Sequence, residues 1–150
     1  MSKILNDEGL DLLFRAARTH SHWRDEEVGD VLLEAIYDLA KMAPTSANCS
    51  PMRVVFVRSP AAKARLRPSL AEGNVDKTMA APVTAVIGYD TRFHAHLPRL
   101  YPHADARAWF EGNEALIQET AFRNGSLQGA YFMLAARALG LDCGPMSGFD

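Results

Sequence analysis

The segment 111–139 restricts the possible folds of this chain more than any other feature of the sequence. Its pattern predicts one long helix, and Gly140 follows it at the position where a left-handed residue commonly ends a helix. Residues 131–136 are apolar on every side, and a helix without a polar face must be buried in a core or against another subunit. In a chain of 150 residues we expect a subunit interface, with burial in the chain's own core as the alternative.

Composition indicates one globular domain spanning residues 1–150, because 48% of the residues are hydrophobic and 23% are charged. The net charge of the chain is −2, and the 16 basic and 18 acidic residues are interspersed along it. The sequence therefore has no basic stripe of the kind that would predict a nucleic-acid partner. The apolar stretch 130–136 ends at Arg137 and is too short to span a membrane. The N-terminus matches neither a signal peptide nor a transit peptide, and we therefore expect a cytoplasmic protein.

The rest of the chain predicts strands among helices. We expect helices over 10–17, from Asp25 through Leu39, over 61–66 and around 72–77. Two runs rich in β-branched residues, 53–58 and 82–89, predict buried strands, and 92–109 should be irregular with short helical pieces. This order predicts an α/β or α+β architecture without fixing the strand direction. Neither a dinucleotide-binding glycine fingerprint nor a phosphate-binding P-loop motif occurs.

The stretch from Pro44 to Pro51 interrupts the helical pattern twice, because each proline lacks an N–H and disfavours helix at the preceding residue. Between the prolines are Thr45, Ser46, Asn48 and Ser50, whose hydroxyl and amide groups suit a polar ligand. An ordinary polar turn is the alternative interpretation.

Further polar residues suit a flavin mononucleotide. The cation of Arg18 could hold the phosphate. Lys77 could stabilise the negative charge that the N1/O2 edge of the ring gains on reduction, with Asn74 one turn back on the same helix face. The loop 144–148 contains glycines that let backbone N–H groups approach N5. Each feature alone also fits a surface charge, a helix face or a plain turn.

Other site classes have weaker support. His20 with His22, and His94 with His96, form H-x-H pairs, but both lie in predicted loops without a third ligand at useful spacing, so we expect no metal site. Cys49 and Cys143 form no C-x-x-C motif, which argues against a structural zinc site or a disulfide framework. A serine hydrolase would need a G-x-S-x-G elbow, which is absent from the sequence.

In order, Arg18 with its loop, the stretch 44–51, Asn74-x-x-Lys77 and the stretch 144–150 resemble the flavin-binding segments of the nitroreductase superfamily. The sequence is similar above all to the branch of malonic semialdehyde reductases of pyrimidine catabolism. The segments that carry this closer resemblance are 17–20, 44–51, 81–85 and 119–124.

The resemblance implies an α+β fold with a mixed sheet flanked by helices and a long central helix at the interface of a homodimer. It also implies an FMN at each of two interface sites. Arg18 and His20 would then approach the phosphate and ribityl end, and Asn74 and Lys77 the pyrimidine edge. Ser147 and Gly148 would lie on the N5 side. The residues implied to reach the partner subunit's flavin are Pro44, Thr45, Ser46 and Asn48.

The implied activity is a two-step hydride transfer from NADH or NADPH through FMN to a small acceptor. Malonic semialdehyde, reduced to 3-hydroxypropionate, is the acceptor that the branch suggests, and nitroaromatics or quinones are the alternative. Arg107 and Arg123 are candidates to bind an anionic substrate, with a purely structural role as the alternative. We name no catalytic acid or base, because the flavin carries the hydride.

Two departures from the family pattern bear on the site. Many members have Arg-x-Ser in the first loop, where this chain has Arg18-x-His20. The chain ends at Asp150, where family members continue with a further strand and basic residues that complete the phosphate site. We therefore expect a fragment or a shortened member, and a non-catalytic dimeric domain is a further alternative.

Overall fold

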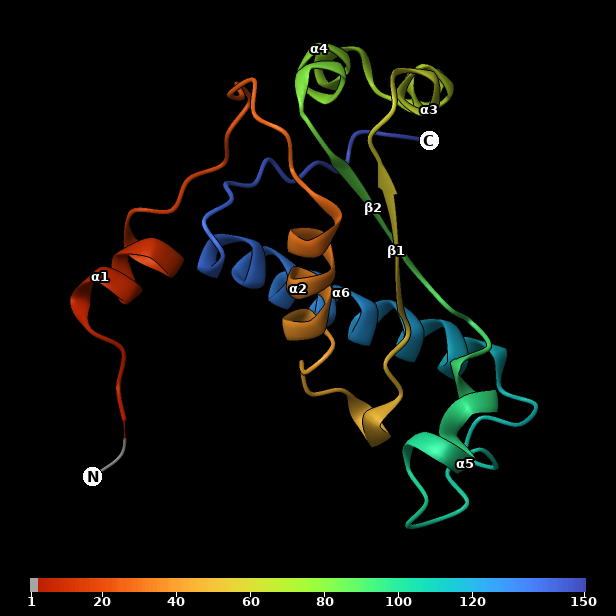
Figure 1. Cartoon of the computed structure of the whole chain (residues 1–150). Helices are drawn as coiled ribbons and strands as arrows, with labels where there is room; N and C mark the ends of the chain where they lie inside the picture. Colours follow the sequence, from red (N-terminus) through yellow and green to blue (C-terminus); the bar gives the residue numbers. More distant parts are fainter. Residues whose placement is uncertain (1–2) are drawn as a thin grey trace.

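The long helix α6 (Glu114–Ala138) is the support against which the two strands and helix α2 pack. Figure 1 shows the computed structural model, which describes residues 3–150. The Asn113 side chain caps the helix by accepting a hydrogen bond from Leu116 N at 3.0 Å. Gly140 ends it with φ of +85°. The predicted long helix and its glycine cap are thus confirmed, with the first turn beginning three residues later than expected.

The two predicted strands are β1 (Met52–Val57) and β2 (Thr84–Tyr89), which pair antiparallel. Met52 lies opposite Tyr89 and Val57 opposite Thr84, so the beginning of each strand lies beside the end of the other. With about 3.4 Å per residue, the two ends of this ribbon are roughly 17 Å apart. This separation decides which loops can share a site within one chain.

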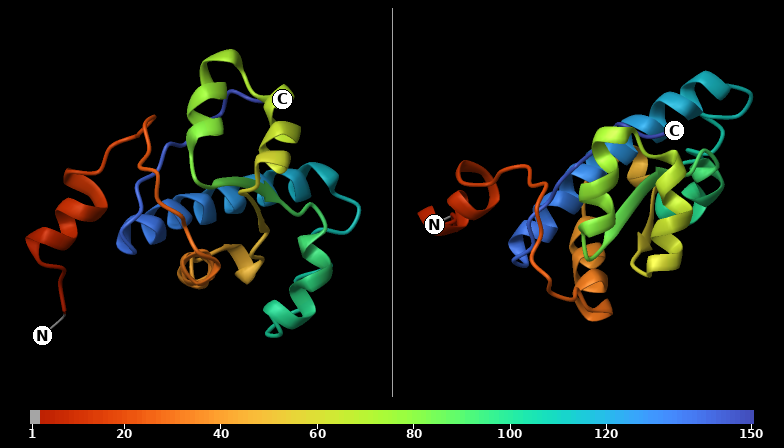
Figure 2. Two further views of the ribbon diagram at one scale, coloured as in Figure 1. Left: turned by 45° about the horizontal axis from the view of Figure 1, so that its top comes forward. Right: turned by 90° about the horizontal axis from the view of Figure 1, so that it is seen from above.

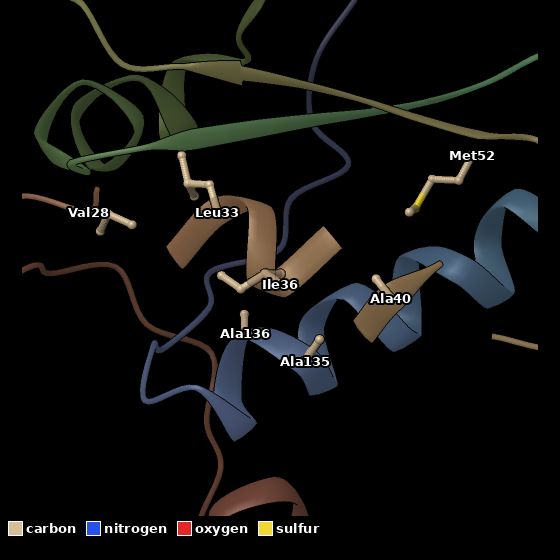
Figure 3. Packing of buried hydrophobic residues seen from close by; sticks show 7 residues of the cluster. All are labelled: Val28, Leu33, Ile36, Ala40, Met52, Ala135 and Ala136. Atoms are coloured by element: carbon tan, nitrogen blue, oxygen red, sulfur yellow. The ribbon is translucent and has the colours of Figure 1, made fainter. Parts of the chain in front are cut away.

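Helix α2 (Asp30–Ala40) crosses α6, and the main core lies between these helices and β1. Figure 3 shows its buried side chains, which are Val28, Leu33, Ile36, Ala40, Met52, Ala135 and Ala136. The predicted helix start at Asp25 is wrong. Residues 25–29 are not helical, because Val28 is drawn into this core and the extended Gly29 precedes the first turn.

The remaining elements are short. The first described elements are α1 (Asp7–Leu10) and a turn of π-helix, η1 (Asp11–Arg15), which bury none of their own side chains. Figure 2 shows α1 at the margin of the molecule, whereas η1 contacts α6. Short helical turns follow at η2 (Ser46–Asn48), η3 (Arg67–Ser69) and η4 (Phe93–His96). The other helices are α3 (Pro60–Leu66), α4 (Glu72–Ala80) and α5 (Leu97–Leu100). A second core joins the loop before β1 to η4, α5 and the first half of α6.

The fold belongs to the predicted α+β class, and its sheet among the described residues consists of β1 and β2. The strands are less buried than predicted, because Val55 is 62% exposed and Val86 and Ile87 are also partly exposed. On α6, Ala135 and Ala136 lie in the chain's own core, whereas Phe122, Leu127 and Tyr131 are exposed. The apolar helix therefore supplies both a core and an uncovered surface. Among residues 3–150, no helix is long and apolar enough to cross a membrane.

Candidate cofactor site

Three segments that are distant in sequence meet beside α4. Thr19 forms a parallel bridge with Cys143, and His20 N donates to Cys143 O at 3.0 Å. Gly148 O accepts two hydrogen bonds of 2.9 Å, one from Ala71 N and the other from Asn74 Nδ2. The loop after η1, the helix α4 and the last residues of the chain therefore form one continuous structure.

Two glycines permit this close approach. A Cβ at Gly144 would lie 2.3 Å from His20 O and 2.8 Å from the ring of Trp23. A Cβ at Gly148 would lie 2.6 Å from Asn74 Nδ2. A larger residue at Gly144 would therefore push the loop 144–148 away from the first loop, and one at Gly148 would displace the Asn74 amide.

The predicted cofactor residues of this half line the junction. Asn74 and Lys77 lie one turn apart on α4, both partly exposed, and Ser147 is exposed beside Gly148. Arg18 is also exposed, and its Nη1 donates to Arg15 O at 2.9 Å and to Ala17 O at 2.8 Å. These backbone contacts hold the guanidinium close to the bend at the end of η1.

His20 contacts the C-terminal segment through its side chain as well as its backbone. Its Nε2 lies 3.5 Å from Asp142 Oδ1, so the protonated imidazole would form an ion pair across the same two segments that its backbone joins. The side chain is 41% exposed. His20 therefore helps to tie the first loop to the C-terminal segment, and its role toward a cofactor stays a prediction.

The Pro44–Pro51 loop is more constrained than a plain turn. Ala47, Asn48 and Ser50 have φ of +48°, +51° and +39°, which is unfavourable for residues other than glycine. Thr45 Oγ1 accepts from Ser50 N at 3.1 Å, and Asn48 Nδ2 donates to Leu100 O at 3.0 Å. Strained residues of this kind persist only where surrounding contacts fix them, and they cluster at functional sites.

Two buried amides on α6, Asn124 and Gln128, supply some of those contacts. Asn124 Oδ1 accepts from Ser46 N at 2.9 Å, while Asn124 Nδ2 donates to Thr120 O at 2.8 Å. Gln128 Oε1 accepts from Met52 N at 2.9 Å. Asn124 belongs to the segment 119–124 that carries the closer resemblance, but neither residue was a predicted site residue. The available sequence signal was their spacing of four, which places two amides on one face of a helix that was predicted to be buried.

The two groups of predicted residues lie apart within one chain. The Pro44–Pro51 loop leads into β1, whereas α4, with Asn74 and Lys77, precedes β2. Because β1 and β2 are antiparallel, these loops lie at opposite ends of the ribbon, roughly 17 Å apart. Figure 1 shows them at the bottom and the top of the molecule. One flavin ring cannot contact both within a single chain.

The two arginines proposed for an anionic substrate have acidic partners. Arg107 Nε lies 3.5 Å from Glu111 Oε1, and Arg123 pairs with Glu119. All four side chains are more than half exposed. These pairs agree with the structural alternative without testing substrate binding.

The described residues, 3–150, contain no group of three His, Cys, Asp or Glu side chains placed to hold a metal ion. Cys49 and Cys143 are free thiols. Burial raises the pKa of each thiol above its ordinary value, which favours the unreactive protonated form at neutral pH.

Comparison with known proteins identifies the family of this chain. The model of the Nitroreductase family matches residues 14–150. A protein of Burkholderia lata, provisionally named an NADH dehydrogenase/NAD(P)H nitroreductase, is 68% identical over 146 residues, which are 97% of this chain and 75% of the relative.

Solved structures agree with the fold. A provisionally assigned Bacillus subtilis nitroreductase has a TM-score of 0.85 at 22% identity, covering 97% of this chain and 78% of that one. Another, from Exiguobacterium sibiricum and solved in complex with FMN, has a TM-score of 0.83 at 18% identity, covering 100% of this chain and 79% of that one. Because the family model matches residues 14–150 and the Burkholderia lata relative is 68% identical, this chain belongs to the nitroreductase family.

Proposed function

We propose that this chain is an FMN-dependent NAD(P)H oxidoreductase. The observation that carries the proposal is the junction at α4, where Thr19 pairs with Cys143 and Asn74 Nδ2 donates to Gly148 O, in a member of the nitroreductase family. The Burkholderia lata relative is named for NAD(P)H nitroreductase activity, and the Exiguobacterium sibiricum homologue was solved with FMN. The first name supports the hydride donor, and the second supports the cofactor.

The donor set at the junction fits FMN. Arg18 supplies a cation for the phosphate, and Lys77 a cation for the ring edge that becomes negative on reduction. Asn74 Nδ2 is engaged by Gly148 O, so its Oδ1 would be the atom to accept a hydrogen bond from the ring. The absence of a Cβ at Gly148 lets this backbone lie against Asn74 and Ala71 at the start of α4. The bound FMN supplies the hydride chemistry, and these residues orient and stabilise it.

The complete site would form between two copies of the chain. Within one chain the Pro44–Pro51 loop is roughly 17 Å from the α4 end of the ribbon, so a second copy must supply Pro44, Thr45, Ser46 and Asn48. The exposed apolar residues Phe122, Leu127 and Tyr131 on α6 offer a surface for that copy. The proposed assembly is a homodimer with two equivalent sites.

Malonic semialdehyde is the acceptor we propose, on the resemblance described above, with reduction to 3-hydroxypropionate. Nitroaromatics or quinones are the second candidate, which the name of the Burkholderia lata relative favours. An anionic aldehyde would be recognised by a cation, and Arg107 or Arg123 would have to leave its present carboxylate partner to act. If Arg107→Ala and Arg123→Ala each leave kcat/KM for the aldehyde unchanged, neither arginine binds that substrate.

The direct test is anaerobic reduction of the FMN-loaded protein. The purified protein is mixed with FMN, desalted, and titrated with NADH and then NADPH without oxygen. Loss of the visible flavin absorption, and its return on adding malonic semialdehyde or a nitroaromatic, would support the reductase and identify the acceptor. A protein that keeps no FMN after desalting would contradict the proposal and favour a non-catalytic dimeric domain.

A further inference from the structure

Trp23 makes a long-range contact that the proposed cofactor set leaves out. Its Nε1 donates to Lys77 O at 2.7 Å, joining residues that are 54 apart in the sequence. The same carbonyl accepts the hydrogen bond from Ala81 N that caps α4. The Trp23 indole therefore fixes the backbone of the residue whose side chain is proposed to stabilise the reduced flavin.

The other side of the Trp23 ring is equally constrained. A Cβ on Gly144 would lie 2.8 Å from Cη2 and 3.1 Å from Cζ2, so the ring packs directly on the glycine backbone. Trp23 also follows closely the strand-like segment in which Thr19 pairs with Cys143. One partly buried side chain thus contacts both α4 and the loop 144–148, the two segments proposed to flank the ring.

We propose that Trp23 is a positioning residue that sets how the Lys77 ammonium is presented to the flavin. This inference rests on the proposed FMN site. A lysine side chain has four rotatable bonds, so an interaction with charge at a fixed place requires that its backbone be held. The indole N–H supplies that restraint through a hydrogen bond, and the packing on Gly144 keeps the opposing loop at a matching distance.

The test separates the N–H from the ring. Trp23→Phe keeps an aromatic ring beside Gly144 and removes the donor to Lys77 O. Affinities for oxidised FMN and dithionite-reduced FMN are measured by anaerobic titration for each variant. We expect the preference for reduced over oxidised FMN to fall about tenfold in Trp23→Phe, equivalent to a midpoint potential about 30 mV more negative.

Lys77→Met identifies the route of the effect. Adding Trp23→Phe to Lys77→Met should leave the preference for reduced FMN unchanged, because the group that Trp23 positions is already absent. Trp109→Phe is the matched control, since the only other tryptophan is 53% exposed and lies just before α6, and it should change neither affinity.

Three results would overturn the inference. Equal losses of affinity for both forms of FMN in Trp23→Phe would indicate a purely structural role. A further drop in the preference in the Lys77→Met background would show that Trp23 acts by another route. Failure of the unmodified protein to bind either form would remove the proposed function as well, which distinguishes that outcome from the other two.

Discussion

Replacing Gly144 by alanine would place a methyl group where the backbone of His20 already lies. The new Cβ would be 2.3 Å from His20 O, whereas ordinary contacts of a Cβ begin near 3.4 Å, so the two segments must separate by about 1 Å. The adjacent hydrogen bond from His20 N to Cys143 O, 3.0 Å long, would then be lost or badly stretched. The substitution therefore opens the junction between the first loop and the C-terminal segment.

The cost follows from two contributions. Overpacking a close contact costs about 1–3 kcal/mol, and losing one backbone hydrogen bond adds about 1 kcal/mol. We expect Gly144→Ala to lower the free energy of unfolding by about 2–4 kcal/mol. Gly73→Ala is the control, because a Cβ there meets nothing within 4 Å and alanine favours the helix α4. That variant should be more stable than the unmodified protein by about 0.5 kcal/mol.

Urea unfolding followed by far-ultraviolet circular dichroism, at one fixed protein concentration and without FMN, measures both changes. The two Gly→Ala substitutions are expected to change the free energy of unfolding in opposite directions, so a general effect of adding a methyl group cannot explain both results. If Gly144→Ala unfolds within 0.5 kcal/mol of the unmodified protein, the close packing of His20, Trp23 and Gly144 described above is wrong.

Three further predictions concern other side chains. Lys63 is buried and donates to Thr78 O at 3.0 Å and Met79 O at 3.2 Å at the end of α4, so Lys63→Met should lower the free energy of unfolding by about 2 kcal/mol. Lys41→Met, at an exposed position, should lower it by under about 0.5 kcal/mol, and equal effects in urea unfolding would contradict this prediction. Asn124→Ala should lower the free energy of unfolding by about 1–3 kcal/mol and weaken FMN binding at least tenfold, because Ser46 N loses its hydrogen-bond acceptor. Unchanged FMN affinity in a fluorescence titration would show that this hydrogen bond does not support FMN binding. Burial raises the pKa of Cys49 and Cys143, so iodoacetamide at pH 8 should label both thiols at least tenfold more slowly in the folded protein than in urea. Equal labelling rates by mass spectrometry would contradict the burial of these thiols.

The sequence predicted the long helix, both strands and the loop segments well, because these depend on local patterns. Helix α6 has an N-cap amide at Asn113 and a glycine after its last turn, and prolines bracket the Pro44–Pro51 loop. The start of α2 was misplaced because the acidic residues from Asp25 onward suit a helix N-terminus, whereas tertiary contacts decide the outcome. Val28 enters the core, and Arg58 pairs with Glu27 and Asp30.

The element on which each candidate residue lies was predictable, and the arrangement of these elements in space was less so. Asn74-x-x-Lys77 could be placed on one helix face from spacing alone, and the structure has both on α4. The contact of Trp23 with Lys77, and the anchoring of Ser46 by Asn124, join residues 54 and 78 apart in sequence. The spacing of Asn124 and Gln128 on α6 could indicate buried amides, but no local pattern identifies the distant partner in either contact. The separation of the two loop groups likewise depended on the antiparallel strand direction, which the β-branched pattern does not determine.

Mixed dimers test the central claim, that each FMN site is made from opposite ends of two chains. Lys77→Glu disables the α4 side, and Ser46→Trp fills the Pro44–Pro51 side at an exposed position. Each variant alone should retain no FMN, whereas a dimer purified to contain one copy of each should bind one FMN that NAD(P)H reduces, because one of its two sites carries neither change. A mixed dimer that binds no FMN would contradict a site shared between chains.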